Sequence, residues 1–147
     1  MEQHENFMRQ AIALAKKGAD SPKGGAFGAV IVCDGKAMVA VHNTVKGSGD
    51  CTQHAETKAI REACGLIGKN NLSNCELYTS CEPCMMCLGA CYWAGFKAIY
   101  FGASALDAKE YGYIYSDMFY NSSAMKRHHE FNMKQLLRDE AIAVWKK

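Results

Sequence analysis

Proline is scarce in this sequence, which has 2 prolines against 13 glycines in 147 residues and no low-complexity tract. No stretch approaches the roughly 18 uninterrupted apolar residues that a membrane-spanning helix needs. Neither sign of charge dominates, because 17 lysines and arginines face 15 aspartates and glutamates for a net charge of +2. With 49% hydrophobic and 22% charged residues, the chain is expected to be globular. These values exclude a disordered, collagen-like or membrane-spanning protein and give no reason to propose a nucleic-acid partner.

The N-terminal residues 1–5 lack the basic start and apolar core of a secretory signal, which predicts a cytoplasmic protein. In that compartment the eight cysteines favour metal ligation or catalysis over disulfides. Four of them fall within residues 81–91, too close together to join distant elements. The other four are expected to be small apolar core residues: Cys33, Cys51, Cys64 and Cys75.

Helix and strand patterns alternate along the chain without a linker or repeat, which predicts a single domain over residues 1–147. Apolar residues at helical spacing predict helices at 5–17, 53–63, 83–94, 104–110 and 129–145. Apolar runs predict strands at 29–33, 38–41, 75–79 and 97–101, with a hairpin turn at Asp34-Gly35. Segments 43–51 and 111–123 are expected to be irregular. This order predicts an α/β fold, a three-layer α-β-α sandwich with helices on both faces of a mixed central sheet.

Two short motifs, HAE at residues 54–56 and PCMMC at residues 83–87, carry the residue types of a metal site. Cys84 and Cys87 are three residues apart, which puts them on one face of a helix with Cβ atoms about 5–6 Å apart. Both sulfurs can then bind one zinc ion. Pro83 places the pair in the first helical turn, where free backbone N–H groups and the helix dipole favour the thiolate form.

His54 and Glu56 can reach one site only if His54 lies at the start of a helix, because helical residues two apart point to nearly opposite sides. His54 as a third ligand leaves one zinc position open to water, as in catalytic sites, and zinc lowers the pKa of such a water to about 7. Glu56 is then expected to be the proton shuttle. This combination of motifs is typical of zinc-dependent nucleobase deaminases. The alternatives are a buried histidine beside ordinary core cysteines and a structural site made of Cys81, Cys84, Cys87 and Cys91.

The chain resembles the cytidine deaminase superfamily over nearly its whole length and is most similar to the guanine deaminase branch. Besides the two motifs, the resemblance rests on residues 24–30 (GGAFGAV), Asn43, residues 79–90 (TSCEPCMMCLGA) and residues 92–94 (YWA). It implies one zinc ion per chain, held by His54, Cys84 and Cys87. It also implies that Asn43 and the backbone N–H of Ala55 hold the substrate, and that Phe27 and Trp93 line its pocket.

The resemblance has two departures. Ala26 stands where the family usually has proline. Guanine deaminases also carry a Gly-Phe-Asp-Asp run whose second aspartate contacts the substrate, whereas this chain reads GYIYSD at residues 112–117. With a two-residue insertion Asp117 takes that position, and we predict it as the second catalytic residue. Without a gap Tyr115 takes it.

The resemblance implies hydrolytic deamination of a free nucleobase, with guanine converted to xanthine and ammonia, and a place in purine metabolism. It also implies a homodimer in which the C-terminal segment can cross to cover the active site of the partner. The alternatives are deamination of cytosine or another aminated heterocycle or nucleoside, deamination of adenosine in tRNA, and a zinc-stabilised binding module without catalysis.

Overall fold

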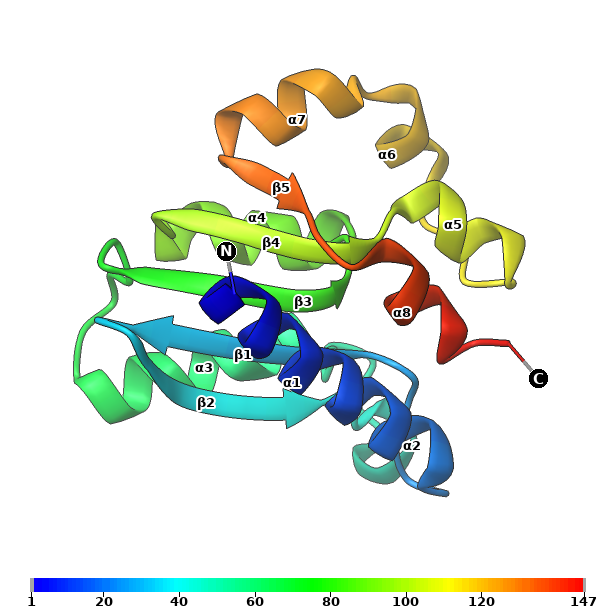
Figure 1. Ribbon diagram of the computed structural model, residues 1–147, viewed down its shortest axis with the longest axis horizontal. Helices are drawn as coiled ribbons and strands as arrows, with labels where there is room; N and C mark the ends of the chain where they lie inside the picture. Colours follow the sequence, from blue (N-terminus) through cyan, green and yellow to red (C-terminus); the bar gives the residue numbers. More distant parts are fainter. Residues whose placement is uncertain (1, 147) are drawn as a thin grey trace.

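The computed structural model describes residues 2–146. Its centre is a five-stranded sheet in the order β2-β1-β3-β4-β5 (Figure 1). The strands are β1 (Gly28–Cys33), β2 (Lys36–His42), β3 (Cys75–Cys81), β4 (Ala98–Ala103) and β5 (Met133–Gln135). β1 pairs antiparallel with β2 and β3, whereas β3, β4 and β5 run parallel to one another. The sheet is therefore mixed, as predicted.

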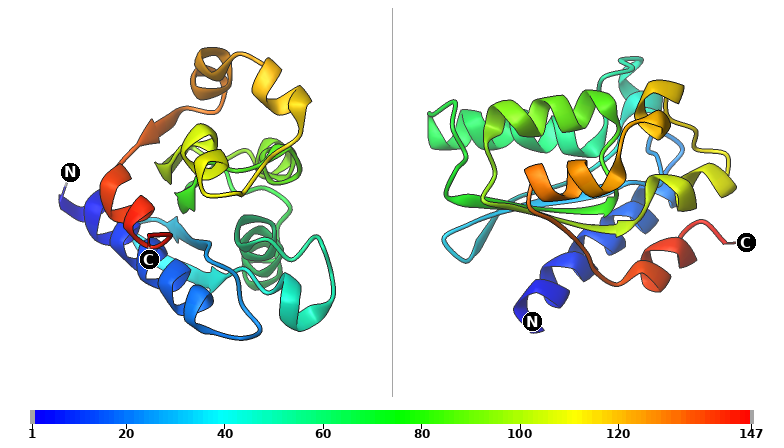
Figure 2. Two further views of the ribbon diagram at one scale, coloured as in Figure 1. Left: turned by 90° about the vertical axis from the view of Figure 1, so that its right-hand side faces the viewer. Right: turned by 90° about the horizontal axis from the view of Figure 1, so that it is seen from above.

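Helices cover both faces of this sheet (Figure 2). α1 (Glu2–Asp20) and α8 (Arg138–Ala143) pack on one face, and α3 (Ala55–Ile67) and α4 (Met85–Ala94) pack on the other. The shorter helices are α2 (Val45–Ser48), α5 (Ala105–Glu110), α6 (Asp117–Asn121) and α7 (Ala124–Glu130). The predicted three-layer α-β-α architecture is confirmed.

Strand β1 lies between the two helical layers and is buried on both sides. Successive side chains of a strand point to opposite faces. Ala29 and Ile31 accordingly pack with buried residues of α3 and α4, whereas Val30 and Val32 pack against Met8 of α1. A strand in this position has to be apolar throughout, which explains the unbroken apolar run in the sequence.

The predicted hairpin forms between β1 and β2. Asp34 and Gly35 have φ values of 53° and 80°, the positive angles that a type I′ turn requires. Elsewhere the predicted elements are present with shifted ends. Segments 43–51 and 111–123 are less irregular than expected, because they contain the short helices α2 and α6.

The predicted helix over residues 129–145 is wrong. This stretch holds the end of α7, the strand β5 and the helix α8. Asn132 and Leu137 adopt left-handed backbone angles, with φ of 49° and 56°, and so end any continuous right-handed helix on each side of β5. β5 instead completes the sheet by pairing with β4, where Phe101 faces Gln135.

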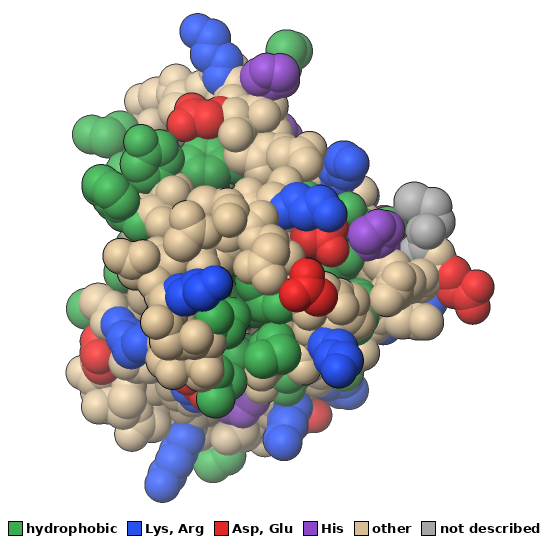
Figure 3. Space-filling view, turned by 90° about the vertical axis from the view of Figure 1, so that its left-hand side faces the viewer, with side chains coloured by type: hydrophobic (Ala, Val, Ile, Leu, Met, Phe, Trp, Pro, Cys, Tyr) green, Lys and Arg blue, Asp and Glu red, His purple; other side chains and the backbone are tan. Residues whose placement is uncertain are grey.

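The surface carries charge of both signs. On the face shown in Figure 3, lysine and arginine side chains lie among aspartates and glutamates and do not gather in one area. Among residues 2–146, no helix combines the length and the apolar character required to cross a bilayer.

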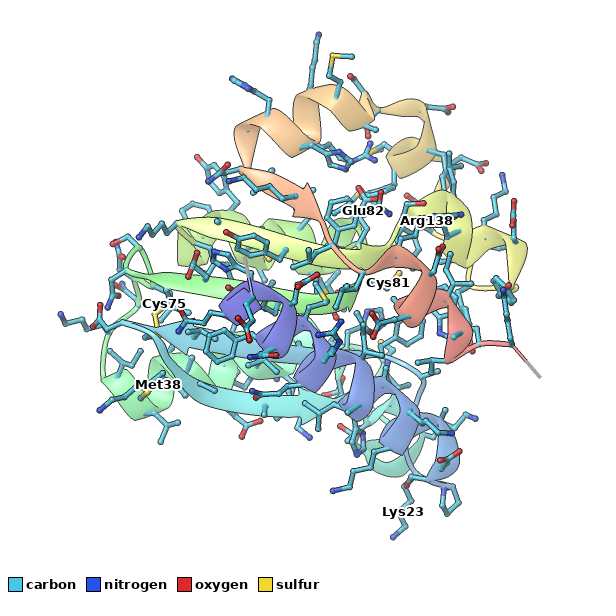
Figure 4. The ribbon with its side chains drawn as sticks, viewed as in Figure 1. Lys23, Met38, Cys75, Cys81, Glu82 and Arg138 are labelled. Atoms are coloured by element: carbon cyan, nitrogen blue, oxygen red, sulfur yellow. A yellow bond between two sulfur atoms is a disulfide. The ribbon has the colours of Figure 1, made fainter. Side chains whose placement is uncertain are left out.

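Cys33 and Cys75 lie in the apolar core, as predicted, but they also form a disulfide, so the expectation that the cysteines do not form disulfides is wrong for this pair. Figure 4 shows Cys75 at the end of the sheet where β3 begins. The two residues face each other in the antiparallel register of β1 and β3, and their Cα atoms are 4.2 Å apart. They are 42 residues apart in the sequence, so only the strand pairing brings the two sulfurs together. Cys51 and Cys64 are free thiols. Cys64 packs against the core as predicted, whereas Cys51 is exposed, so its prediction as a core residue is wrong.

Candidate active site

The predicted metal ligands lie at the N-termini of two neighbouring helices. His54 immediately precedes α3 and has extended backbone angles (φ −66°, ψ 152°). Cys84 holds the same position before α4 (φ −70°, ψ 178°). Because His54 lies outside the helix, its side chain does not follow the helical spacing that would turn it away from Glu56. The positive dipole ends of both helices also favour thiolate ligands at this place.

The donor atoms of His54, Cys84 and Cys87 lie within 4.8 Å of one another. Nδ1 of His54 is 3.5 Å from Sγ of Cys84 and 3.6 Å from Sγ of Cys87. A tetrahedral zinc ion with Zn–N bonds of about 2.05 Å and Zn–S bonds of about 2.3 Å separates nitrogen and sulfur ligands by about 3.6 Å. The type of the donors and their spacing therefore fit zinc.

The structural site of four cysteines does not form. Cys91 is buried in the apolar core, and Sγ of Cys81 lies 3.1 Å from the hydroxyl of Tyr115. Within residues 2–146, His54, Cys84 and Cys87 are the one group of histidine, cysteine or acidic residues arranged to hold a metal ion. With three protein ligands, a fourth tetrahedral position is left for water or substrate.

Glu56 lies in the first turn of α3 and is 6% exposed. Burial, followed by the nearby charge of Cys84, raises its pKa to about 7. A carboxyl group with such a pKa can both accept and donate a proton near neutral pH. The thiol of Cys84 shows the opposite shift, because hydrogen bonds with the Cys87 thiol and then with His54 lower its pKa to about 4. This shift favours the thiolate form of Cys84, which is the form that binds metal.

A cavity of about 400 Å³ adjoins these residues. Its volume is within the range of about 300–1,000 Å³ that is usual for small-molecule pockets, and its wall is mostly apolar with a few polar groups, as such pockets usually are. The wall is formed by Phe27, Asn43, His54, Glu56, Cys84, Met85, Met86, Tyr113, Ile114, Tyr115 and Ser116. A heterocyclic base would fit this space beside the metal ligands.

The sequence of residues 1–103 matches the cytidine and deoxycytidylate deaminase zinc-binding region. The chain belongs to this family. Zinc binding is a property of the matched region, and the donor geometry described above fits the same ion. Both findings confirm the prediction of a zinc cofactor.

Members of the family that are similar to this chain act on different substrates. A guanine deaminase of Bacillus subtilis (strain 168) is 51% identical over 110 residues, which cover 75% of this chain and 70% of that protein. The crystal structure of guanine deaminase from Bacillus subtilis matches with a TM-score of 0.77 and 47% identity, over 84% of this chain and 80% of that chain. A tRNA-specific adenosine deaminase of Aquifex aeolicus is 39% identical over 111 residues, 75% of this chain and 71% of that protein. These similarities confirm the predicted enzyme class, a hydrolytic nucleobase deaminase.

Two of the four predicted substrate-binding residues, Asn43 and Phe27, line the cavity of this family member. Oδ1 of Asn43 accepts a hydrogen bond from the backbone N–H of Val45 at 3.0 Å, so its amide nitrogen is the end left for a ligand. A Cβ atom on Gly25 would lie 2.9 Å from Cγ of Asn43, which explains why glycine is needed there. Ala55 is fully buried as the first residue of α3 and lies between His54 and Glu56, which both line the cavity.

Trp93 does not line the cavity, contrary to what the resemblance implied. Its side chain is 80% exposed and lies beside a separate shallow hollow with Ile60 and Lys69. The reason is the helical phase: Trp93 follows Cys87 by six residues, which turns it by about 240° around α4 and away from the metal ligands.

Asp117 does not line the cavity either. It is exposed as the first residue of α6, whereas Tyr115 forms part of the wall. The position in the wall is therefore filled as the alignment without a gap predicts, and the catalytic role of Asp117 stays a prediction. Among residues 2–146, Glu56 is the only acidic residue that lines the cavity.

Sequence reasoning missed a hydrogen-bonded network behind this wall. The hydroxyl of Tyr115 donates to the backbone carbonyl of Glu82 at 2.5 Å. The carboxylate of Glu82 is buried (Figure 4) and pairs with Arg127 at 3.3 Å and with His128 at 2.9 Å. Glu82 precedes Cys84 by two residues, so the network joins α7 to the loop that carries a metal ligand. No local spacing reveals it, because the partners lie 33 to 46 residues apart in the sequence.

Proposed function

We propose that this chain catalyses the hydrolytic deamination of a free nucleobase, and that guanine is converted to xanthine and ammonia. The observation that carries this proposal is the position of Glu56, buried on the wall of a base-sized cavity beside three residues whose donor atoms fit zinc. Similarity to guanine deaminase from Bacillus subtilis over most of both chains supports the choice of base.

The side chains of the cavity supply the roles that this reaction needs. Zinc held by His54, Cys84 and Cys87 would lower the pKa of water and so supply a nucleophile at neutral pH. Glu56 accepts one proton of the attacking water and transfers it to the ring nitrogen next to the reacting carbon. It then takes the proton of the hydroxyl group added to that carbon and delivers it to the amine, so that the carbonyl forms and ammonia leaves. The amide nitrogen of Asn43 and the backbone N–H of Ala55 donate hydrogen bonds to the ring edge.

Ammonia release from a panel of substrates tests the proposal. The zinc-loaded chain is incubated with guanine, adenine, cytosine, their nucleosides and one tRNA that carries adenosine in its anticodon loop. We expect guanine to give the highest kcat/KM. Faster ammonia release from cytosine or from a nucleoside would show that this compound, and not guanine, is the substrate. No release from any member of the panel would refute deamination.

Adenosine in tRNA is the second candidate, because the tRNA-specific adenosine deaminase of Aquifex aeolicus is 39% identical to this chain. An enzyme acting on tRNA needs many contacts to phosphate, and its binding weakens steeply with salt. The net charge of +2 favours a free base instead. Raising the salt concentration from 50 to 200 mM should therefore leave KM nearly unchanged.

We also propose that two copies of the chain form a homodimer. Large apolar side chains are exposed on the outer side of α3 and α4: Leu66 is 66% exposed, Tyr92 58% and Trp93 80%. Exposed apolar patches of this kind mark interaction surfaces. Light scattering of the zinc-loaded protein should give about twice the mass of one chain, and Trp93→Glu should shift the protein toward single chains. A monomer at tens of micromolar would contradict the proposal.

A further inference from the structure

A hydroxyl group lies next to one of the predicted zinc ligands. Thr57 is the third residue of α3, and its Oγ1 donates a hydrogen bond of 3.1 Å to Sγ of Cys87 in α4. The two residues are 30 positions apart in the sequence, and they meet because α3 and α4 pack side by side on one face of the sheet (Figure 2). The helix that carries Glu56 therefore also carries a contact to a metal ligand of the neighbouring helix.

The direction of this hydrogen bond differs from the common pattern for a threonine in a helix. The hydroxyl of such a threonine often bonds to a backbone carbonyl three or four residues earlier. The carbonyl three residues before Thr57 belongs to His54, and it accepts the backbone N–H of Lys58 at 2.9 Å. The Thr57 hydroxyl instead points across to α4, so it acts on the metal site and not on its own helix.

The sulfur of Cys87 depends on this one donor. The side chain of Cys87 is fully buried, so bulk water does not reach the sulfur and cannot replace the hydroxyl. Neither His54 nor Cys84 has a hydroxyl partner in the part of the chain that the structure describes. A buried acceptor that loses its donor costs free energy, and hydrogen bonds to charged acceptors such as a thiolate are the stronger ones.

We propose that Thr57 is a positioning residue of the zinc site, whose hydroxyl orients the Cys87 thiolate toward the ion and stabilises its charge. Hydrogen bonds to metal ligands fix the orientation of the ligand and tune its strength, and their loss typically lowers metal affinity about 10–100-fold. Thr57 does not line the cavity, so its effect on the reaction passes through Cys87. The inference concerns the zinc site and does not depend on which base is deaminated.

Zinc affinity of three variants tests this role. Zinc-loaded protein is titrated with a chromophoric chelator, and the amount of zinc transferred gives the dissociation constant. Thr57→Val keeps the shape of the side chain without its hydroxyl and should weaken zinc binding about 10–100-fold. Thr57→Ala removes the same hydroxyl without adding bulk and should give the same loss, which keeps the test decisive if valine disturbs the packing of the two helices. Thr57→Ser keeps the hydroxyl and should restore most of the affinity.

The matched control is Thr79→Val in β3. The hydroxyl of Thr79 is also buried, but it donates to the backbone carbonyl of Cys81 at 2.8 Å and not to a zinc ligand. This variant should lower the melting temperature and leave the zinc affinity unchanged. Normal zinc affinity in Thr57→Val or in Thr57→Ala, a Thr57→Ser protein as weak as these two, or an equal loss in Thr79→Val would overturn the proposal.

Cobalt(II) in place of zinc reports on the sulfur itself. Complexes of cobalt with thiolates show a sulfur-to-cobalt charge-transfer band, whose energy rises when a hydrogen bond stabilises the electrons of the sulfur. Loss of the Thr57 hydroxyl should therefore move this band to longer wavelength in Thr57→Val, and Thr57→Ser should return it. A role in helix packing alone would leave the band in place, so an unmoved band in the Thr57→Val protein would refute the assignment.

Neither measurement uses a substrate, so this inference and the proposed function can fail separately. If no base in the panel releases ammonia but zinc binding still depends on the Thr57 hydroxyl, the proposed function is refuted and the positioning role stands. If guanine is deaminated and Thr57→Val binds zinc as tightly as the unchanged chain, the positioning role is refuted and the proposed function stands.

Discussion

Glu56→Gln should lower kcat by about 10²–10⁴-fold, the range that general acid–base catalysis by one residue usually contributes. Glutamine has nearly the same shape as glutamate, but it can neither take a proton from water nor deliver one to the ring. Because Glu56 is 6% exposed and the only acidic residue described in the cavity wall, no neighbouring carboxyl group can replace it. The measurement is ammonia release at saturating substrate, together with the zinc content of both proteins.

Zinc content should stay at about one ion per chain in this variant, because Glu56 is not one of the three grouped donors. Glu62→Gln is the matched control: it lies on the same helix, is exposed and is remote from the cavity. It should keep full activity. A Glu56→Gln enzyme with normal turnover would remove the proton-transfer role and with it the mechanism.

His54→Ala should abolish zinc binding and reduce ammonia release to the level of a zinc-free sample. The three donors are the minimum that catalytic zinc sites retain, and a site with two thiolates alone would not hold the ion at the same affinity. After dialysis against a weak chelator, the zinc content measured by elemental analysis should therefore fall from about one ion per chain to nearly none. Circular dichroism shows whether the fold is kept.

Cys91→Ala is the control for the loss of a metal ligand, because Cys91 lies on the same helix as Cys87 but packs in the apolar core. Removing its sulfur should cost stability through a small cavity and leave the zinc content unchanged. A His54→Ala protein that retains zinc, or a Cys91→Ala protein that loses it, would show that the ligands have been assigned wrongly.

The metal ligands and Glu56 could be predicted from the sequence because short spacings and the two helix starts define them. Because His54 lies just before the helix, its side chain can face the same site as Glu56 although the two are only two residues apart. Pro83 marks the corresponding helix start before Cys84. Trp93 and Asp117 were assigned through the resemblance and not through geometry. For Trp93 the six-residue distance from Cys87 already indicates the opposite side of α4, so helical phase would have corrected the expectation.

Contacts between distant segments could not be predicted in the same way. The stretch 129–145 has a helical pattern of apolar residues, yet pairing of β5 with β4 and two left-handed residues override that pattern. The Cys33–Cys75 disulfide depends on the register of β1 and β3. The contact between the rings of Trp145 and Phe27 likewise depends on how α8 packs against the rest of the chain, and local sequence does not predict that packing.

The buried carboxylate of Glu82 has a consequence for the design of altered substrate specificity. It is bound by Arg127 and His128 of α7, and its own carbonyl holds the hydroxyl of Tyr115. Replacing residues 111–116 alone with another loop would remove the hydrogen bond of Tyr115 to the Glu82 carbonyl and leave the contacts of the Glu82 carboxylate with α7 in place. A chimera should therefore exchange residues 111–130 as a single block together with Glu82, so that the backbone carrying Cys84 keeps its shape while the wall of the cavity is exchanged.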